Sequence, residues 1–289
     1  MSRKRLWKSL TLLCLFLLPW QTHWLAGQID IAGLDWEFGK ARIYAVELVA
    51  IIAFCLRGRP VFQRLEIKRV IFGIFAAVFL SVTFSIRSDL AFFQLLHLAS
   101  ASALFLLLID ERIDRRQAIW AFAFGLVIPS VLGWLQFVVD SSGASTWLGL
   151  AAQNAQTLGT SVIEIGGERV MRAYGSFPHP NVFGGFLVVA ILALFQLKKE
   201  GSRSVEVIRP CLLALLSSTL VITFSRSAWL AIAISMSVLV YRLMFPIKKK
   251  CPDRVIFSPS NFSLYVVMLS LVITVFFTRD LVFSRFNPS

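Results

Sequence analysis

Charged residues are scarce in this chain. Of its 289 residues, Asp, Glu, Lys and Arg make up 16%, hydrophobic residues make up 57%, and the mean hydropathy is +0.75. An ordinary soluble domain has about 25% charged and about 45–50% apolar residues. The shortage of charge therefore excludes a soluble globular enzyme and a disordered tail, and it indicates a polytopic, all-α membrane protein.

Cysteine and histidine are also scarce, and nucleotide-binding motifs are absent. The chain has four cysteines and three histidines, and their spacing fits neither a zinc site nor a disulfide framework. It contains no P-loop, no detectable repeat and no obvious inverted halves. We therefore expect no cofactor and no metal, and a proton-coupled transporter has little support.

Nine apolar runs approach the length of about 20 residues that a membrane-spanning helix needs. They are residues 6–26, 41–56, 70–86, 90–109, 118–139, 182–197, 210–225, 227–245 and 262–278. The sequence therefore predicts about nine transmembrane helices within a single transmembrane domain, residues 1–289.

Basic residues are divided unevenly between the segments that join these runs. With the N-terminus inside, the inner segments hold 21 of the 29 lysines and arginines, and the outer segments hold eight. Inner loops of membrane proteins carry such an excess, so the pattern predicts an N-in, C-out arrangement. The topology also accounts for the net charge of +13, so no binding of nucleic acid is needed to explain it.

The longest predicted outer loop covers residues 140–181. Apolar residues recur at helical spacing over 146–158, which predicts a short amphipathic helix, lying either at the membrane interface or on the bundle. Two β-prone runs, 161–165 and 168–174, flank Gly166-Gly167 and predict a β-hairpin.

After the hairpin, residues 172–181 read Arg-Ala-Tyr-Gly-Ser-Phe-Pro-His-Pro-Asn and lead into the sixth run. Asn181 is suited to cap the helix that follows, and a helix N-terminus that faces outward favours anions. The segment fits a rigid junction between loop and helix. The alternative is a site where Arg172, His179 and Asn181 face an anionic ligand at the membrane surface.

A second polar element, Thr-Phe-Ser-Arg-Ser-Ala-Trp at 223–229, interrupts the apolar stretch 210–245. Two spans need about 40 residues, more than this stretch contains, so the turn must be tight and Arg226 must lie near the outer interface. An arginine at that depth either faces the bundle interior or extends to the headgroups. Its planar guanidinium suits a diphosphate because it binds two oxygens at once.

Together the two elements resemble the motifs of a known family. Residues 172–181 with Gly184-Gly185 are similar to the Arg-x-x-Gly-x-Phe-x-x-Pro-Asn signature of O-antigen ligase-like proteins, and Ser225-Arg226-Ser227 is similar to their Ser-Arg-(Ser/Gly) element. The family includes O-antigen ligases and O-antigen polymerases. The resemblance implies a GT-C-like bundle, working at the outer face of the cytoplasmic membrane. Such proteins move a glycan from a polyprenyl diphosphate carrier to a hydroxyl of a sugar, lipid or protein, without metal or nucleotide.

The resemblance also implies roles for individual residues. Arg226 and Arg172 would be catalytic, because fixed guanidinium groups stabilise the negative charge that develops on the departing diphosphate. The residues that would bind substrate beside them are Ser225, His179, Asn181 and Gly175. The family's general base is usually a histidine in a long loop near the C-terminus. Because the sequence given has no such loop, we expect it to be C-terminally truncated relative to the family pattern.

Two other functions stay open from the sequence. A flippase or related transporter would move a lipid-linked oligosaccharide across the bilayer without forming a glycosidic bond. A non-catalytic membrane protein becomes the better interpretation if the reading frame ends at residue 289. Ligases and polymerases share both motifs, so the sequence favours neither of them.

Overall fold

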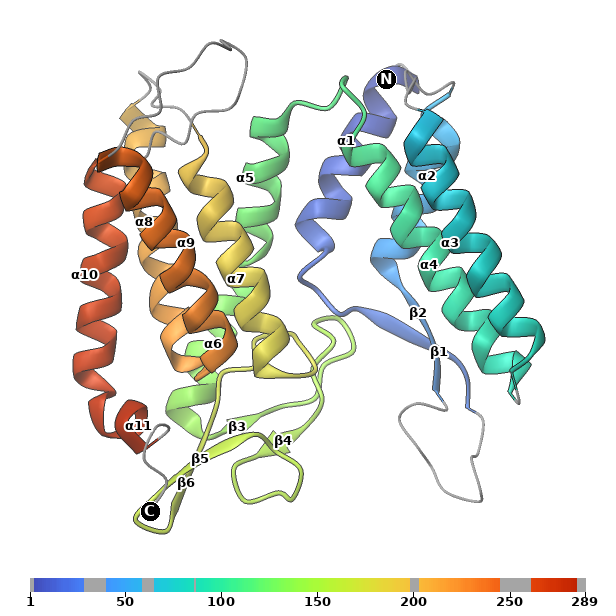
Figure 1. The fold of residues 1–289 in the computed structure, drawn as a ribbon. Coiled ribbons are helices and arrows are strands. Elements are labelled where there is room, and N and C mark those ends of the chain that lie inside the picture. The colour runs from blue at the N-terminus through green and yellow to red at the C-terminus, as the bar shows by residue number, and fades with distance from the viewer. Residues whose placement is uncertain are drawn as a thin grey trace. The chain divides into compact units, whose positions relative to one another are not determined.

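The structure is a computed structural model and is mostly helical (Figure 1). It describes residues 3–28, 40–58, 65–85, 87–197, 203–244 and 261–284. Residues 86 and 245, where two of the nine runs were expected to end, lie outside this set, as does the end of the chain after residue 284. The chain divides into two compact units, Met1–Ala118 and Ile119–Ser289, which are described separately below.

The first unit contains four helices and a two-stranded sheet among its described residues. In chain order these are α1 (Arg3–Leu17), β1 (His23–Gln28), β2 (Lys40–Tyr44), α2 (Ala45–Leu56), α3 (Leu65–Thr83) and α4 (Ser88–Leu108). Helix α4 packs against each of the other three helices. Trp7, Ala53, Leu107 and Ile113 form its buried apolar cluster.

The first two predicted spans are shorter than expected. Helix α1 ends at Leu17, because Pro19 has no backbone N–H to continue the helical hydrogen bonds. The rest of the run 6–26 enters β1, which pairs antiparallel with β2. The run 41–56 is therefore helical only from Ala45. Apolar composition alone does not distinguish these strands from helix ends.

The second unit is built around α7 and α8. The boundary between the units falls within α5 (Arg115–Gly125), and the later elements are α6 (Val127–Val139), β3 (Ser141–Ser142), β4 (Gln153–Asn154), β5 (Val162–Ile165), β6 (Glu168–Met171), α7 (Pro180–Phe195), α8 (Arg203–Ile222), α9 (Arg226–Met244), α10 (Asn261–Phe277) and α11 (Arg279–Ser284). Helix α8 contacts α6, α7, α9 and α10. Phe183, Leu187, Leu194, Leu213 and Leu216 are fully buried between these helices.

Among the described residues, three helical segments are long and apolar enough to span a membrane: Leu90–Leu108, Arg115–Val139 and Val205–Ile222. Five shorter apolar helices accompany them, at Ala45–Leu56, Phe72–Thr83, Pro180–Phe195, Arg226–Tyr241 and Tyr265–Phe277. Large apolar side chains such as Phe72 (75%) and Phe277 (81%) are exposed, as expected of helix surfaces that face hydrocarbon. These features are those of a helical membrane protein. The number of spans, their orientation and the single transmembrane domain stay predictions.

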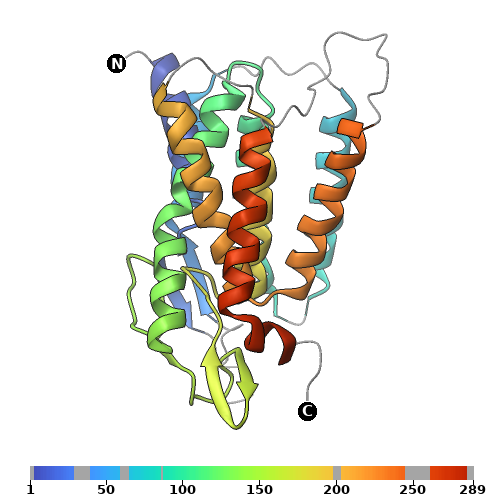
Figure 2. The same cartoon turned by 90° about the vertical axis from the view of Figure 1, so that its left-hand side faces the viewer.

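The loop of residues 140–181 contains the predicted hairpin. Strands β5 and β6 pair antiparallel, with Glu164 opposite Arg169, and both central glycines have positive φ, 57° at Gly166 and 87° at Gly167. This conformation is the one that a tight two-residue hairpin turn requires. The hairpin projects beyond the ends of the helices (Figure 2).

The predicted amphipathic helix over 146–158 was wrong. This segment consists of turns and the short strand β4, which pairs with β3. Gly149 has a φ of 65°, which ends any right-handed helix at that point. The side chain of Asn154 also accepts a hydrogen bond from the backbone N–H of Gln156 at 2.9 Å, a local turn that competes with helix formation.

Candidate functional site

The two sequence motifs meet at one end of the second unit, where α7 and α9 begin. Arg172 follows β6 and joins the motifs directly. Its Nε donates to the backbone carbonyl of Thr223 at 2.8 Å, and its Nη2 donates to Oδ1 of Asn181 at 2.7 Å. The backbone N–H of Ala173 donates to the carbonyl of Ile222 at 3.0 Å. The structure thus brings together two segments that lie about 50 residues apart in the sequence.

Arg172 is only 4% exposed. Two of its donors already bind neutral oxygens within the protein, so the geometry gives its side chain a positioning role. It holds the turn between α8 and α9 against the start of α7. A catalytic role for Arg172 stays a prediction.

The α8–α9 turn is as tight as the sequence predicts. Three residues separate the two helices, and the middle one, Phe224, has a φ of 48° although it is not a glycine. A left-handed conformation costs an L-residue roughly 1–2 kcal/mol. Phe224 is fully buried, with its ring against Phe137 and Trp229. Packing of this ring holds the strained turn in place.

Ser225 precedes the first residue of α9 and caps it. Its Oγ accepts from the backbone N–H of Ala228 at 3.4 Å and lies 3.2 Å from Oγ of Ser227. Ser225 is buried. Its side chain therefore orders the N-terminus of the helix that carries Arg226.

Two glycines of the first motif allow close packing at this end. A Cβ on Gly184 would lie 2.9 Å from Cβ of Ala228 and 3.2 Å from Cβ of Ser225, so α7 packs directly on the start of α9. A Cβ on Gly175 would lie 2.9 Å from the carbonyl oxygen of Pro129, and Gly175 has a φ of 59°. The backbone conformation and the lack of space at position 175 therefore require glycine, whether or not this residue contacts a substrate.

His179 is the N-cap of α7. Its Nδ1 accepts from the backbone N–H of Asn181 at 3.1 Å, and its Nε2 lies 3.1 Å from Oγ of Ser161. Because Nδ1 accepts, the neutral ring carries its hydrogen on Nε2 and donates it to Ser161. Burial, with the positive charge of Arg172 beside it, lowers the pKa of His179. A neutral ring with both nitrogens engaged is poorly suited to act as a general base.

Arg226 contrasts with Arg172. It is the first residue of α9 and is exposed. Among the described residues, none forms a hydrogen bond or an ion pair with its guanidinium. The N-termini of α7 and α9 lie together here, and each carries partial positive charge. This end of the unit therefore presents positive charge to its surroundings.

An apolar groove of about 820 Å³ is lined from Trp229 onward, three residues after Arg226 on the same helix. Its lining comes from α8, α9 and α10, and Trp229 and Tyr241 mark its extent along α9. Those two residues are 12 positions apart, which corresponds to roughly 18 Å of helix. The sequence showed the apolar composition of these helices, but it gave no signal that they leave a groove between them.

Gln136 is a further site residue that the sequence reasoning missed. It is buried on α6, where its Oε1 accepts from the backbone N–H groups of Tyr174 and Gly175, and its Nε2 donates to the carbonyl of Gly175. The amide thereby fixes the segment between Arg172 and His179. A polar residue within the apolar run 118–139 was the available signal.

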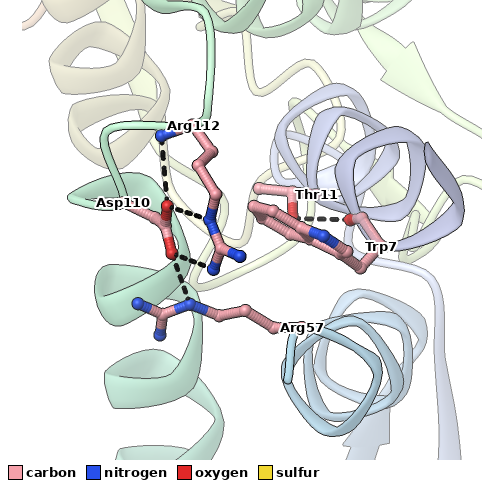
Figure 3. A network of polar contacts seen from close by, with 5 residues as sticks. All are labelled: Trp7, Thr11, Arg57, Asp110 and Arg112. Carbon is pink, nitrogen blue, oxygen red and sulfur yellow. Dashed lines mark hydrogen bonds and ion pairs between the residues drawn. The ribbon is translucent and has the colours of Figure 1, made fainter. Parts of the chain in front are cut away.

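A separate polar network lies in the first unit (Figure 3). Nε of Arg57 donates to Asp110 at 2.6 Å, and Arg112 donates to both oxygens of Asp110 at 2.7 and 2.8 Å. These hydrogen bonds, led by those from Arg112, hold the pKa of Asp110 well below its usual range. The Arg112 guanidinium also lies 4.8 Å from the ring centre of Trp7. The network joins the ends of α1, α2 and α4.

No protein-family model, curated protein or solved structure matches this chain.

Proposed function

We propose that this chain is an O-antigen ligase- or polymerase-like glycosyltransferase, which moves a glycan from a polyprenyl diphosphate carrier to an acceptor hydroxyl. In this proposal the chain crosses the cytoplasmic membrane about nine times, with the N-terminus inside, and the site faces outward. The observation that carries it is Arg226, an exposed arginine three residues before Trp229, which lines the apolar groove.

A polyprenyl diphosphate has the two chemical features that this arrangement matches. Its diphosphate is a compact anion, which a guanidinium and helix N-termini bind well. Its prenyl chain is a long hydrocarbon, which gains free energy from burial against Leu220, Trp229 and Met236 in the groove. The groove starts within one turn of Arg226. One carrier molecule can therefore place its diphosphate at Arg226 and its prenyl chain in the groove.

The proposed chemistry is a displacement at the anomeric carbon of the carrier-linked sugar. The acceptor oxygen forms the new bond as the bond from the sugar to the diphosphate oxygen breaks. Negative charge grows on the departing polyprenyl diphosphate, where Arg226 and the N-terminus of α9 stabilise it. The proton of the acceptor hydroxyl passes to a general base, a role for which His179 is poorly suited.

Binding of the carrier is the first test. The purified protein in nanodiscs is titrated with polyprenyl diphosphate and with the neutral polyprenol of the same length. We expect Arg226→Ala to weaken binding of the diphosphate while leaving polyprenol binding unchanged. Ala233→Trp, which fills the groove, weakens both, whereas Ile234→Trp, on the same helix but outside the lining, weakens neither.

Glycan transfer is the second test, measured in cells or in proteoliposomes supplied with a polyprenyl diphosphate-linked glycan. Removal of one group that stabilises transition-state charge costs about 10²–10³ in rate, and we expect that loss for Arg226→Ala. Arg279, an exposed arginine at the start of α11, is the matched control. Undiminished transfer by Arg226→Ala would refute the assignment. Movement of the lipid-linked glycan across the bilayer without transfer would identify a flippase instead.

A further inference from the structure

The first unit contains a smaller cavity, of about 310 Å³, between α2, α4 and the end of the α1 segment. Most of its lining is apolar, including Leu18, Ala50, Leu104 and Leu108. Three polar residues, Glu47, His97 and Ser100, interrupt that lining. None of them belongs to the Arg226 site or to the Asp110 network.

The three polar residues form one hydrogen-bonded group. Glu47 Oε1 lies 2.5 Å from His97 Nδ1 and accepts from Ser100 Oγ at 3.1 Å. Glu47 Oε2 accepts from the backbone N–H of Tyr44 at 3.1 Å. The side chains of Glu47 and His97 are only 18% and 27% exposed. Ionisable groups within apolar helices are costly to keep, so they usually mark a functional site.

His97 has one ring nitrogen left for a ligand. Nδ1 of His97 faces the Glu47 carboxyl, and the tautomer with its hydrogen on Nδ1 has the ring lone pair on Nε2. No described residue forms a hydrogen bond with Nε2. The Glu47 carboxyl, in contrast, already meets Nδ1 of His97 and the backbone N–H of Tyr44, and it shares the Ser100 hydroxyl with the carbonyl of His97. In this tautomer the pair presents a hydrogen-bond acceptor on His97.

We propose that this cavity binds a neutral lipid with a hydroxyl head, whose hydroxyl donates to Nε2 of His97. The hydrocarbon chain lies along α4 toward Leu108, a distance of 11 residues or roughly 16 Å. An anionic head is disfavoured because Glu47 is an acidic residue and the lining contains no lysine or arginine. A cationic head is disfavoured because the Glu47 carboxyl is already engaged by His97 and by the backbone N–H of Tyr44. The site lies wholly in the first unit and does not depend on the proposed glycosyl transfer.

The test uses the intact protein in nanodiscs and 1-dodecanol that carries a diazirine for photo-crosslinking. We expect crosslinks on cavity residues of α2 and α4. Unlabelled dodecanol should compete about tenfold better than dodecyl methyl ether, which has no hydroxyl hydrogen to donate. Farnesol and a short-chain benzoquinol, used as competitors, distinguish a prenol from a quinol as the source of the hydroxyl.

His97→Phe keeps an aromatic ring and removes the acceptor. We expect this variant to bind the alcohol and the ether equally, a change that general destabilisation does not produce. Leu104→Trp fills the cavity and abolishes crosslinking there, whereas Leu96→Trp, at an exposed position of the same helix, leaves it unchanged.

Three results would overturn the proposal. They are crosslinks outside the cavity, equal competition by alcohol and ether in the unmodified protein, and discrimination that persists in His97→Phe. Stronger competition by dodecylammonium than by dodecanol would show that the site prefers a cation, and would overturn it equally.

Discussion

Two pairs of arginines, one in each unit, are used in opposite ways. Arg57 and Arg112 in the first unit share the carboxylate of Asp110, and Arg57 is almost completely buried. In the second unit, Arg172 binds a carbonyl and an amide oxygen, while Arg226 is exposed and reaches no described acidic group. In the first unit the carboxylate of Asp110 lies against both guanidinium groups, whereas in the second unit Arg172 holds two neutral oxygens and Arg226 has no acidic partner among the described residues.

The difference shows which arginines to associate with stability and which with function. A buried charge without an opposite charge is costly, so a guanidinium beside a buried carboxylate is best explained by folding. An arginine without a partner among the described residues, at a helix N-terminus, is the kind of residue to which the proposed function gives a ligand. Substitutions of these arginines and their partners test this division between stability and function.

Asp110→Ala should be the most damaging of these changes. It leaves Arg57 and Arg112 close together at the end of α2 and α4 without their shared carboxylate. Removal of one partner from a buried ion pair costs about 3–5 kcal/mol. The loss is measured as a lower unfolding temperature in detergent. Asp280→Ala, which removes an 80%-exposed carboxylate, is the control and should change little.

The same comparison predicts a pH dependence. The folded pKa of Asp110 is depressed, so its contribution to stability is complete above its unfolded pKa of about 3.9 and declines as pH falls below that value. The stability difference from Asp110→Asn should therefore be constant at neutral pH and shrink only in strong acid. A difference that already shrinks near pH 6 would mean that another group is responsible.

Some of this division was visible in the sequence. The Arg226 turn followed from chain length, because the 36-residue stretch 210–245 leaves no room for a loop between the two predicted spans. The hairpin followed from Gly166-Gly167. The sequence pattern did not predict the contacts of Arg172 with Thr223 and of Glu47 with His97. Each contact joins segments about 50 residues apart and depends on how the helices pack. Pattern and spacing predict elements better than the contacts between them.

Arg172→Ala should destabilise the second unit, whereas Arg226→Ala should not. Arg172 makes two hydrogen bonds from a charged donor, and we expect the loss of its guanidinium to cost about 1.5–3 kcal/mol, the range for hydrogen bonds to charged groups. Arg226 is exposed, so we expect its variant to keep the unfolding temperature of the original protein. Thermal unfolding of both variants in one detergent provides the comparison. Equal destabilisation would show that Arg226 also holds the fold, and the division between the two arginines would fail.

Gly184→Ala tests the close approach that places Arg226 beside the start of α7. The added methyl group would lie 2.9 Å from Cβ of Ala228, and such overpacking costs about 1–3 kcal/mol. Gly185→Ala is the matched control, because nothing lies within 4 Å of its added Cβ. If the two variants unfolded at the same temperature, α7 and α9 would not pack as tightly as described.

His179 provides the smallest and most specific test, because its charge state depends on Arg172. Its folded pKa is lowered, first by burial and then by the Arg172 charge. As pH falls below about 6.5, the unfolded chain therefore takes up a proton before the folded chain does, and stability decreases. His179→Asn keeps an N-cap acceptor but does not titrate, so it should lose this slope of stability with pH. Arg172→Gln removes the neighbouring positive charge but leaves His179 buried, so it should reduce the slope of stability with pH without abolishing it. If His179→Asn kept the dependence of stability on pH, that dependence would come from another group. The folded protein would then not hold His179 neutral, and His179 would again be a candidate for proton transfer.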